Sequence, residues 1–188
     1  MTNKYESFNL EIEDNIANII LSRPEQLNSM SRKFWVELPE ILEEVNRNSE
    51  IRVLIISSTG KHFCAGMDLS AFDNGVANIP KEKRPDNARI GEALYRSARE
   101  LQEYISKLEK IRVPVIAAIH GGCIGGAVDL VTACDIRLAT TDAFFCIQEI
   151  NIGMAADVGT LQRLPRIIPD SKTVSYTHLR ATRRLVIS

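Results

Sequence analysis

Three acidic residues and two glycine-containing turns are the parts of this sequence best suited to chemistry. Asp129, Glu149 and Asp157 lie in otherwise apolar sequence, where a carboxylate is costly to bury unless it is paired or used. The turns, at residues 58–69 and 121–126, each follow a strand-like apolar run. Two backbone N–H groups aimed at one point form an oxyanion hole, which stabilises negative charge developing on a carbonyl oxygen. Such a site suits enolate chemistry on a thioester.

Each of these features also has a purely structural interpretation. The glycines of the second turn would also allow tight packing of a strand against a helix. Asp157 is placed to cap the next helix, and Glu149 to face solvent from a strand. Against this, Gly126 falls in the first turn of a predicted helix, where N–H groups are unpaired and the dipole is positive. Two acids that lie near each other push their pKa values apart, so a pair of them could hold one proton between them and act as base and acid in turn.

The elements that must position these residues alternate between strands and helices. We expect strands at residues 8–12, 16–21, 53–57, 114–119, 136–138 and 144–147, and helices at 34–45, 90–108, 127–133 and 158–167. The first two strands predict an N-terminal hairpin, and the later alternation predicts an α/β fold with parallel pairing. Ser31 is the expected N-cap of the first helix, and Pro39 is expected to interrupt it. Residues 71–89 predict a loop.

Composition argues against several other classes of function. The net charge of −1 disfavours nucleic acid or an anionic membrane as the main partner. No apolar run approaches the ~20 residues that span a bilayer, and residues 1–14 resemble no targeting segment, so we expect a cytoplasmic protein. Residues 121–126 do not fit the GxGxxG pattern of a dinucleotide site. We expect no metal and no separate cofactor. The cysteines lack CxxC spacing and predict buried thiols; they are Cys64, Cys123, Cys134 and Cys146.

Three segments resemble the crotonase, or enoyl-CoA hydratase/isomerase, superfamily. They are HFCAGMDL at residues 62–69, HGGCIGG at 120–126 and ACDIR at 133–137. The resemblance covers residues 5–170 and implies an α/β fold with a ββα spiral core. It implies that the N–H groups of Met67 and Gly126 form the oxyanion hole. The residues that it implies for binding CoA or substrate are Ala65, Gly66, Asp68, Leu69 and Gly125.

Within the superfamily, the chain is most similar to the Δ3,5-Δ2,4-dienoyl-CoA isomerase subgroup. The stretches that carry this similarity are VDL at residues 128–130, DAFF at 142–145 and GMAADVGTLQRLP at 153–165. Position by position, Asp129, Glu149 and Asp157 match the three catalytic acids of that subgroup. Enoyl-CoA hydratases are similar too, but they typically carry Glu at the position of Asp129 and no acid at that of Asp157.

The resemblance implies an isomerase that converts a 3,5-dienoyl-CoA into a 2,4-dienoyl-CoA. Glu149 would remove a proton from C2 to give a dienolate, Asp157 would deliver a proton at C6, and Asp129 would hold Glu149 or the substrate in place. CoA would enter only as part of the substrate. Two other functions stay open: an enoyl-CoA hydratase, and a non-catalytic binding protein on the same scaffold. The near-neutral charge disfavours an RNA-binding protein of that last kind.

The last segment of the chain departs from the family pattern. Family members continue well beyond this length, with C-terminal helices that cover the acyl pocket and build a trimer. We therefore expect an incomplete core domain over residues 1–170, without trimerisation helices, and a full-length form that is a homotrimer or hexamer. Residues 171–188 are rich in Thr and Arg. We expect them to be a non-native or disordered tail.

Overall fold

A five-stranded sheet lies at the centre of the fold in the computed structural model, which describes residues 5–68 and 86–178. The strand order is β1-β2-β3-β4-β6. The strands are β1 (Phe8–Glu13), β2 (Ile16–Leu21), β3 (Val53–Ser58), β4 (Val115–Ile119) and β6 (Ile136–Ala139). β1 and β2 pair antiparallel, with Phe8 opposite Leu21, and every later pair is parallel. The predicted hairpin and the predicted parallel pairing are therefore confirmed.

A second, two-stranded sheet is built from the second glycine turn. β5 (Gly122–Ile124) pairs parallel with β7 (Phe144–Cys146), with Cys123 opposite Phe145. The sequence predicted only a turn at residues 121–126, so β5 is an addition to the expected elements. Its short length explains the omission, because three residues carry too little alternation to indicate a strand.

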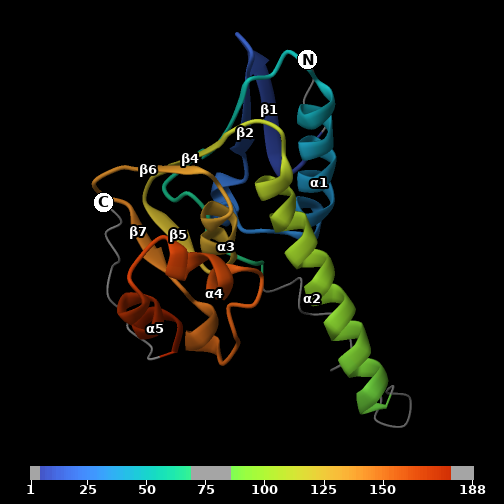
Figure 1. The fold of residues 1–188 in the computed structure, drawn as a ribbon, viewed down its shortest axis with the longest axis vertical. Helices are drawn as coiled ribbons and strands as arrows, with labels where there is room; N and C mark the ends of the chain where they lie inside the picture. Colours follow the sequence, from blue (N-terminus) through green and yellow to red (C-terminus); the bar gives the residue numbers. More distant parts are fainter. Residues whose placement is uncertain (1–4, 69–85, 179–188) are drawn as a thin grey trace.

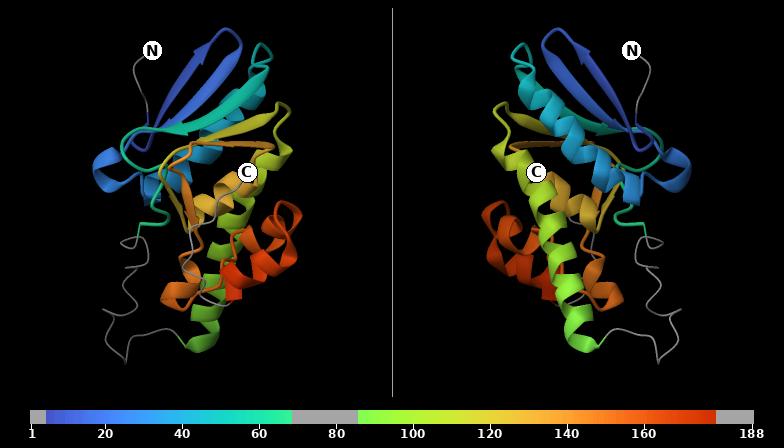
Figure 2. Two further views of the ribbon diagram at one scale, coloured as in Figure 1. Left: turned by 90° about the vertical axis from the view of Figure 1, so that its left-hand side faces the viewer. Right: turned by 90° about the vertical axis from the view of Figure 1, so that its right-hand side faces the viewer.

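Helices cover the sheets and connect their strands. The α-helices are α1 (Arg32–Arg47), α2 (Asn87–Lys110), α3 (Gly126–Thr132), α4 (Thr160–Arg163) and α5 (Asp170–His178). The 3-10 helices are η1 (Pro24–Gln26), η4 (Glu149–Ile152) and η5 (Leu164–Arg166). In Figures 1 and 2, α4 and α5 lie at the end of the molecule away from the β1–β2 hairpin. α3 is buried along its whole length.

The core lies mainly between α1 and one face of the large sheet. Alternate residues of β2 and β3 are buried, as a strand with one face on a core requires. On α1, the residues that pack toward them follow helical spacing, and they are Phe34, Leu38, Ile41, Leu42 and Val45. Ser31 caps this helix by accepting a hydrogen bond from Phe34 N–H, which confirms its predicted role.

The structure corrects two predictions about helix continuity, and both corrections involve a proline. α1 continues through Pro39, and because Pro39 is buried beside Leu38, packing offsets the missing backbone hydrogen bond. The helix expected at residues 158–167 is instead split into α4 and η5. Pro165 lies just after the break, and it has no N–H with which to continue the α-helical ladder.

The structure describes only part of two predicted segments, the loop at residues 71–89 and the tail at residues 171–188. α2 begins at Asn87, where Asp86 accepts a hydrogen bond from Arg89 N–H at 3.0 Å, so it starts inside the predicted loop. The rest of that loop, up to residue 85, lies outside the described residues. Residues 171–178, which we expected in a foreign or disordered tail, belong to α5, with Thr173 buried. A foreign origin of that segment stays a prediction. Within the described ranges, no helix is long and apolar enough to cross a membrane.

Candidate active site

The first glycine turn is tied to the second sheet by backbone hydrogen bonds. They join Phe63 N to His120 O (2.9 Å), Cys64 N to Gly122 O (3.1 Å) and Ile124 N to Cys64 O (3.0 Å). Gly66 follows with φ +88°, and a Cβ there would lie 2.6 Å from Ile124 O, so neither the conformation nor the space admits a side chain. Because β5 leads directly into α3, this pairing brings the end of the turn to the N-terminus of that helix.

The two amides predicted for the oxyanion hole lie close together. Met30 pairs with the residues on either side of Met67 through Met30 N to Gly66 O (2.8 Å) and Asp68 N to Met30 O (3.1 Å). The N–H of Met67 itself has no hydrogen-bond partner in residues 5–68 or 86–178. Gly126 is the first residue of α3, where N–H groups lack intrahelical acceptors. A Cβ on Gly126 would lie 3.9 Å from Met67 N. Their joint action on a carbonyl oxygen stays a prediction.

The other residues predicted to bind CoA or substrate flank this point, with one exception. Ala65 N donates to Leu27 O at 3.0 Å, and Asp68 is half-buried. Gly125 is the N-cap of α3, with φ +56°. Leu69 lies outside the described residues. A role in CoA binding stays a prediction for each of them.

Asp129 is a buried acid held in one orientation. It lies on α3 with 1% of its surface exposed, and its Oδ1 accepts a hydrogen bond from Thr160 N–H at 2.6 Å. Burial raises its pKa to about 6, although the hydrogen bonds of Thr160 and the charge of Arg163 act in the opposite direction. The charge of Asp157 adds to the rise. The carboxylate of Asp129 is therefore fixed and electrostatically coupled to its neighbours.

Glu149 is the acid best suited to take up a proton. It opens η4, and its Oε1 faces Gly125, where an added Cβ would lie 3.3 Å away. Its Oε2 is buried and has no hydrogen-bond partner in the described parts of the chain. Burial raises its pKa to about 7, and the charges of Asp129 and Asp157 contribute to the rise. The alternative of a solvent-facing strand residue is therefore wrong.

Asp157 is an exposed residue of the turn between η4 and α4, and its neighbours Ala156 and Val158 are buried. Its backbone O accepts a hydrogen bond from Gln102 Nε2 at 2.8 Å. Its charge raises the pKa of both Asp129 and Glu149, so its carboxylate lies within electrostatic reach of the other two acids. The alternative role as helix cap is wrong, because Gly159 is the N-cap of α4. Asp129 thus lies in α3 and Glu149 beside its N-cap Gly125, with Asp157 within electrostatic reach of both.

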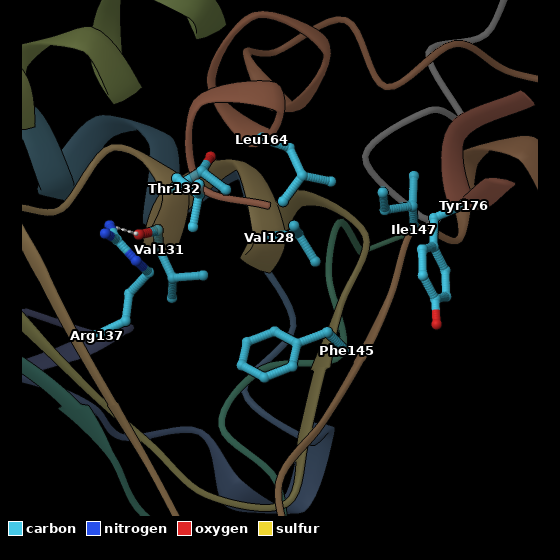
Figure 3. Close-up of a pocket in the computed structure, with 9 residues that line it drawn as sticks. Val128, Val131, Thr132, Arg137, Phe145, Ile147, Leu164 and Tyr176 are labelled. Carbon is cyan, nitrogen blue, oxygen red and sulfur yellow. Dashed lines mark hydrogen bonds between the residues drawn. The ribbon is translucent and has the colours of Figure 1, made fainter. Parts of the chain in front are cut away.

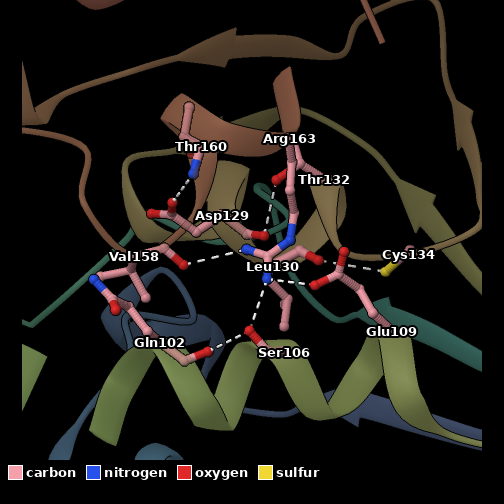
Figure 4. Close-up of polar contacts among 10 residues, drawn as sticks. All are labelled: Gln102, Ser106, Glu109, Asp129, Leu130, Thr132, Cys134, Val158, Thr160 and Arg163. Atoms are coloured by element: carbon pink, nitrogen blue, oxygen red, sulfur yellow. Dashed lines mark hydrogen bonds and ion pairs between the residues drawn. The ribbon is translucent and has the colours of Figure 1, made fainter. Parts of the chain in front are cut away.

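Sequence reasoning missed the residues that support these acids. Thr160, Arg163 and Gln102 contact Asp129 or the turn that carries Asp157. Figure 4 shows them between α3, α4 and α2. Arg163 joins α4 to α2 by donating to Ser106 Oγ at 2.9 Å and to Glu109 Oε2 at 2.6 Å. No local pattern marks the contacts of Gln102 with Asp157 or of Arg163 with Ser106 and Glu109, because each pair lies more than 50 residues apart along the chain. Asp129 and Thr160 are 31 residues apart.

A small apolar cavity lies on another side of α3 (Figure 3). Its volume of about 10 Å³ is close to the minimum for one water molecule. The side chains around it come from α3, the second sheet, η5 and α5, and include Val128, Phe145, Leu164 and Tyr176. None of the three acids lines it, and it is too small for an acyl chain.

The cysteines and other metal-binding side chains suggest no second chemistry. Cys64, Cys123 and Cys134 are buried free thiols, as predicted, and Cys146 is half-buried. Burial raises the pKa of Cys64 to about 12, so this thiol is not a nucleophile at neutral pH. Among the described residues, no group of three or more His, Cys, Asp or Glu side chains is arranged to hold a metal ion.

Comparison with known proteins points to one family. The sequence profile of the family described as enoyl-CoA hydratase/isomerase matches residues 11–183. A peroxisomal Δ(3,5)-Δ(2,4)-dienoyl-CoA isomerase of Arabidopsis thaliana is 44% identical over 83% of this chain and 55% of its own length. The mitochondrial enzyme of that name from Rattus norvegicus is 43% identical over 91% of this chain and 52% of its own length.

Solved structures agree with this assignment of the fold. The crystal structure of a putative enoyl-CoA hydratase from Streptomyces coelicolor A3(2) superposes with a TM-score of 0.82 at 26% identity, covering 98% of this chain and 64% of that chain. The chain thus spans about half the length of the curated relatives that it matches. The matched profile and the relatives together show that the chain belongs to the enoyl-CoA hydratase/isomerase family.

Proposed function

We propose that the protein isomerises 3,5-dienoyl-CoA thioesters to 2,4-dienoyl-CoA thioesters. The observation that carries the proposal is the state of Glu149: a half-buried carboxyl with a pKa of about 7, one unpartnered oxygen, and two further acids within electrostatic reach. A general base works best when its pKa lies near the working pH. The names of the relatives from Arabidopsis thaliana and Rattus norvegicus support the same reaction.

The reaction moves one proton between two distant carbons. The thioester oxygen accepts hydrogen bonds from Met67 N–H and Gly126 N–H, and Glu149 takes a proton from C2. The electron pair then spreads from the oxygen to C6 as a dienolate, which the two amides stabilise. Asp157 gives a proton to C6, which leaves double bonds at C2 and C4. No cofactor is needed, because CoA is already part of the substrate.

Asp129 has a supporting role in this scheme. Its carboxylate is fixed by Thr160 N–H and contributes to the raised pKa of Glu149. A negative neighbour makes Glu149 a stronger base once it is ionised, because protonation relieves the repulsion. Asp129 therefore tunes the base, and Asp157 acts at the other end of the conjugated system.

One assay with one variant tests the proposal. Conversion of a 3,5-dienoyl-CoA is followed by ultraviolet absorbance, and we expect Asp157→Asn to abolish it while CoA-ester binding is retained. Asp170→Asn, in α5, is the matched control. An unchanged rate in Asp157→Asn would remove Asp157 from the mechanism. Water addition to a 2-enoyl-CoA without isomerisation would instead establish the hydratase alternative.

Two further properties of the full-length protein belong to the proposal. We propose a homotrimer or hexamer, as the family resemblance implies, and sedimentation analysis of the full-length form tests it. We also propose a cytoplasmic location. The relatives from Arabidopsis thaliana and Rattus norvegicus are named as peroxisomal and mitochondrial proteins, so localisation of the full-length protein in its own cell is the deciding measurement.

A further inference from the structure

Side chains of α2 and α4 hold the turn that carries Asp157, just before the Gly159 N-cap of α4. Within the described residues, no hydrogen bond is donated by the backbone N–H groups of residues 155–159. Instead, two consecutive carbonyl groups accept from side chains: Asp157 O from Gln102 Nε2 at 2.8 Å, and Val158 O from Arg163 Nη1 at 3.3 Å. These two donors therefore hold the backbone that carries the Asp157 side chain.

Arg163 anchors this turn to α2. Its guanidinium donates to Ser106 Oγ at 2.9 Å and pairs with Glu109 Oε2 at 2.6 Å, while its other terminal nitrogen reaches Val158 O. Only 11% of its side chain is exposed. The planar guanidinium can hold several acceptors in fixed directions, which an ammonium cannot do. Figure 4 shows the guanidinium between α4 and α2, with the carbonyl of Val158 beside it.

The geometry of Gly159 independently supports this position of the Arg163 guanidinium. A Cβ on Gly159 would overlap Arg163 Nη1, and the residue has φ +133°, which side-chain-bearing residues rarely adopt. The guanidinium thus occupies the space directly over the turn. The residue after Val158 must be glycine for Arg163 to reach the carbonyl of Val158.

We propose that Arg163 is a positioning residue, which fixes the turn of residues 157–159 against α2 and so directs the Asp157 carboxylate toward the substrate. The inference rests on the proposed function for its consequence in catalysis, but the positioning itself is a property of the fold. Arg163 also acts on charge: it opposes the rise in the pKa of Asp129, whose other charged or titratable neighbours are Glu149, Asp157 and the Cys123 thiol.

The kinetic test compares four variants in the complete chain. Arg163→Gln removes both the positive charge and the planar set of guanidinium donors. Arg163→Lys keeps the charge but not the planar donors. Gln102→Ala removes only the hydrogen bond to Asp157 O. Arg166→Gln, at an exposed position of η5, is the control. We expect kcat to fall by about 10- to 100-fold in Arg163→Gln with little change in KM, because a small misplacement of a reacting group has effects of this size.

Two readouts do not depend on turnover. Hydrogen exchange of the amides of Thr160 and Gln162, which donate to Asp129 Oδ1 and Gly159 O, should be faster in Arg163→Gln and in Gln102→Ala than in the wild type. The pKa of Asp129, followed by carbon-13 NMR, should rise in Arg163→Gln and stay unchanged in Gln102→Ala. If Arg163→Gln does not fold, Arg163→Lys and Gln102→Ala carry the exchange and kinetic tests.

The outcomes separate the two proposals. Exchange and kcat at wild-type values in Arg163→Gln would overturn the positioning role. A fall in kcat equalled by Arg166→Gln would overturn it as well. A wild-type chain that binds the thioester but does not isomerise it would refute the proposed function, whereas faster exchange and a raised Asp129 pKa in Arg163→Gln would still support the positioning role.

Discussion

Replacing Glu149 by Gln should abolish isomerisation and at the same time stabilise the protein at alkaline pH. The pKa of Glu149 is raised from its ordinary value of 4.5 to about 7, first by burial and then by Asp129 and Asp157. The folded protein therefore prefers the protonated acid. The stability that this preference contributes is present below pH 4.5 and is lost as the pH rises through about 7.

The size of the effect follows from the same shift. At 1.36 kcal/mol per pKa unit, ionised Glu149 lowers the free energy of unfolding by up to about 3 kcal/mol above pH 8. Gln keeps the shape of the side chain and has no charge to bury. We expect Glu149→Gln to exceed the wild type in unfolding free energy by about 1–3 kcal/mol at pH 8.5, and by about 1 kcal/mol or less at pH 5.

Urea unfolding followed by tryptophan fluorescence measures this difference directly. Trp35 is the only tryptophan of the chain and is buried in α1, so its emission reports loss of the core. Glu13→Gln, at an exposed position of β1, is the matched control and should change neither stability nor activity. A Glu149→Gln variant that is less stable than the wild type at pH 8.5, or a gain that does not depend on pH, would refute the reasoning.

Three other measurements test the site. The kcat/KM of the wild type should show a transition near pH 7, because the ionisation of Glu149 decides whether it can act as base; a flat profile from pH 5 to 8 would exclude Glu149. In Gly126→Ala the new Cβ would lie 3.0 Å from Met30 Sδ and beside Met67 N, so kcat should fall about 100-fold; normal turnover would exclude this oxyanion hole. Gly66→Ala should lower the unfolding free energy by about 1–3 kcal/mol, because the residue has φ +88° and meets Ile124 O; equal urea midpoints would contradict this.

Much of the fold followed from local patterns. The hairpin of residues 8–21, the Ser31 cap and the helix that begins at Gly126 all depend on neighbouring residues, so periodicity and capping rules predict them. Pro39 is a residue for which the local rule failed, because α1 continues through it. Its effect on α1 depends on burial against the sheet, and burial depends on residues far away in the sequence.

The sequence identified the acids of the candidate site, but it did not identify the side chains that hold them in place. Acids in apolar sequence marked Asp129 and Glu149, because buried carboxylates are unusual. Local sequence left the N-cap role of Asp157 open, since the turn before α4 depends on the backbone conformation of Gly159. The contacts of Arg163 with α2 could not be predicted, since 57 residues separate Arg163 from Ser106.

Glu149 and Asp157 lie on short connections, whereas Met67 and Gly126 are fastened to paired backbone. An acid on a connection can be gained, lost or moved by one substitution without disturbing a ladder of the sheets. The amides have no such freedom, because they belong to the main chain itself. On such a scaffold, the proposed oxyanion hole would be retained while substitutions in the connections changed which acids exchange protons with the substrate.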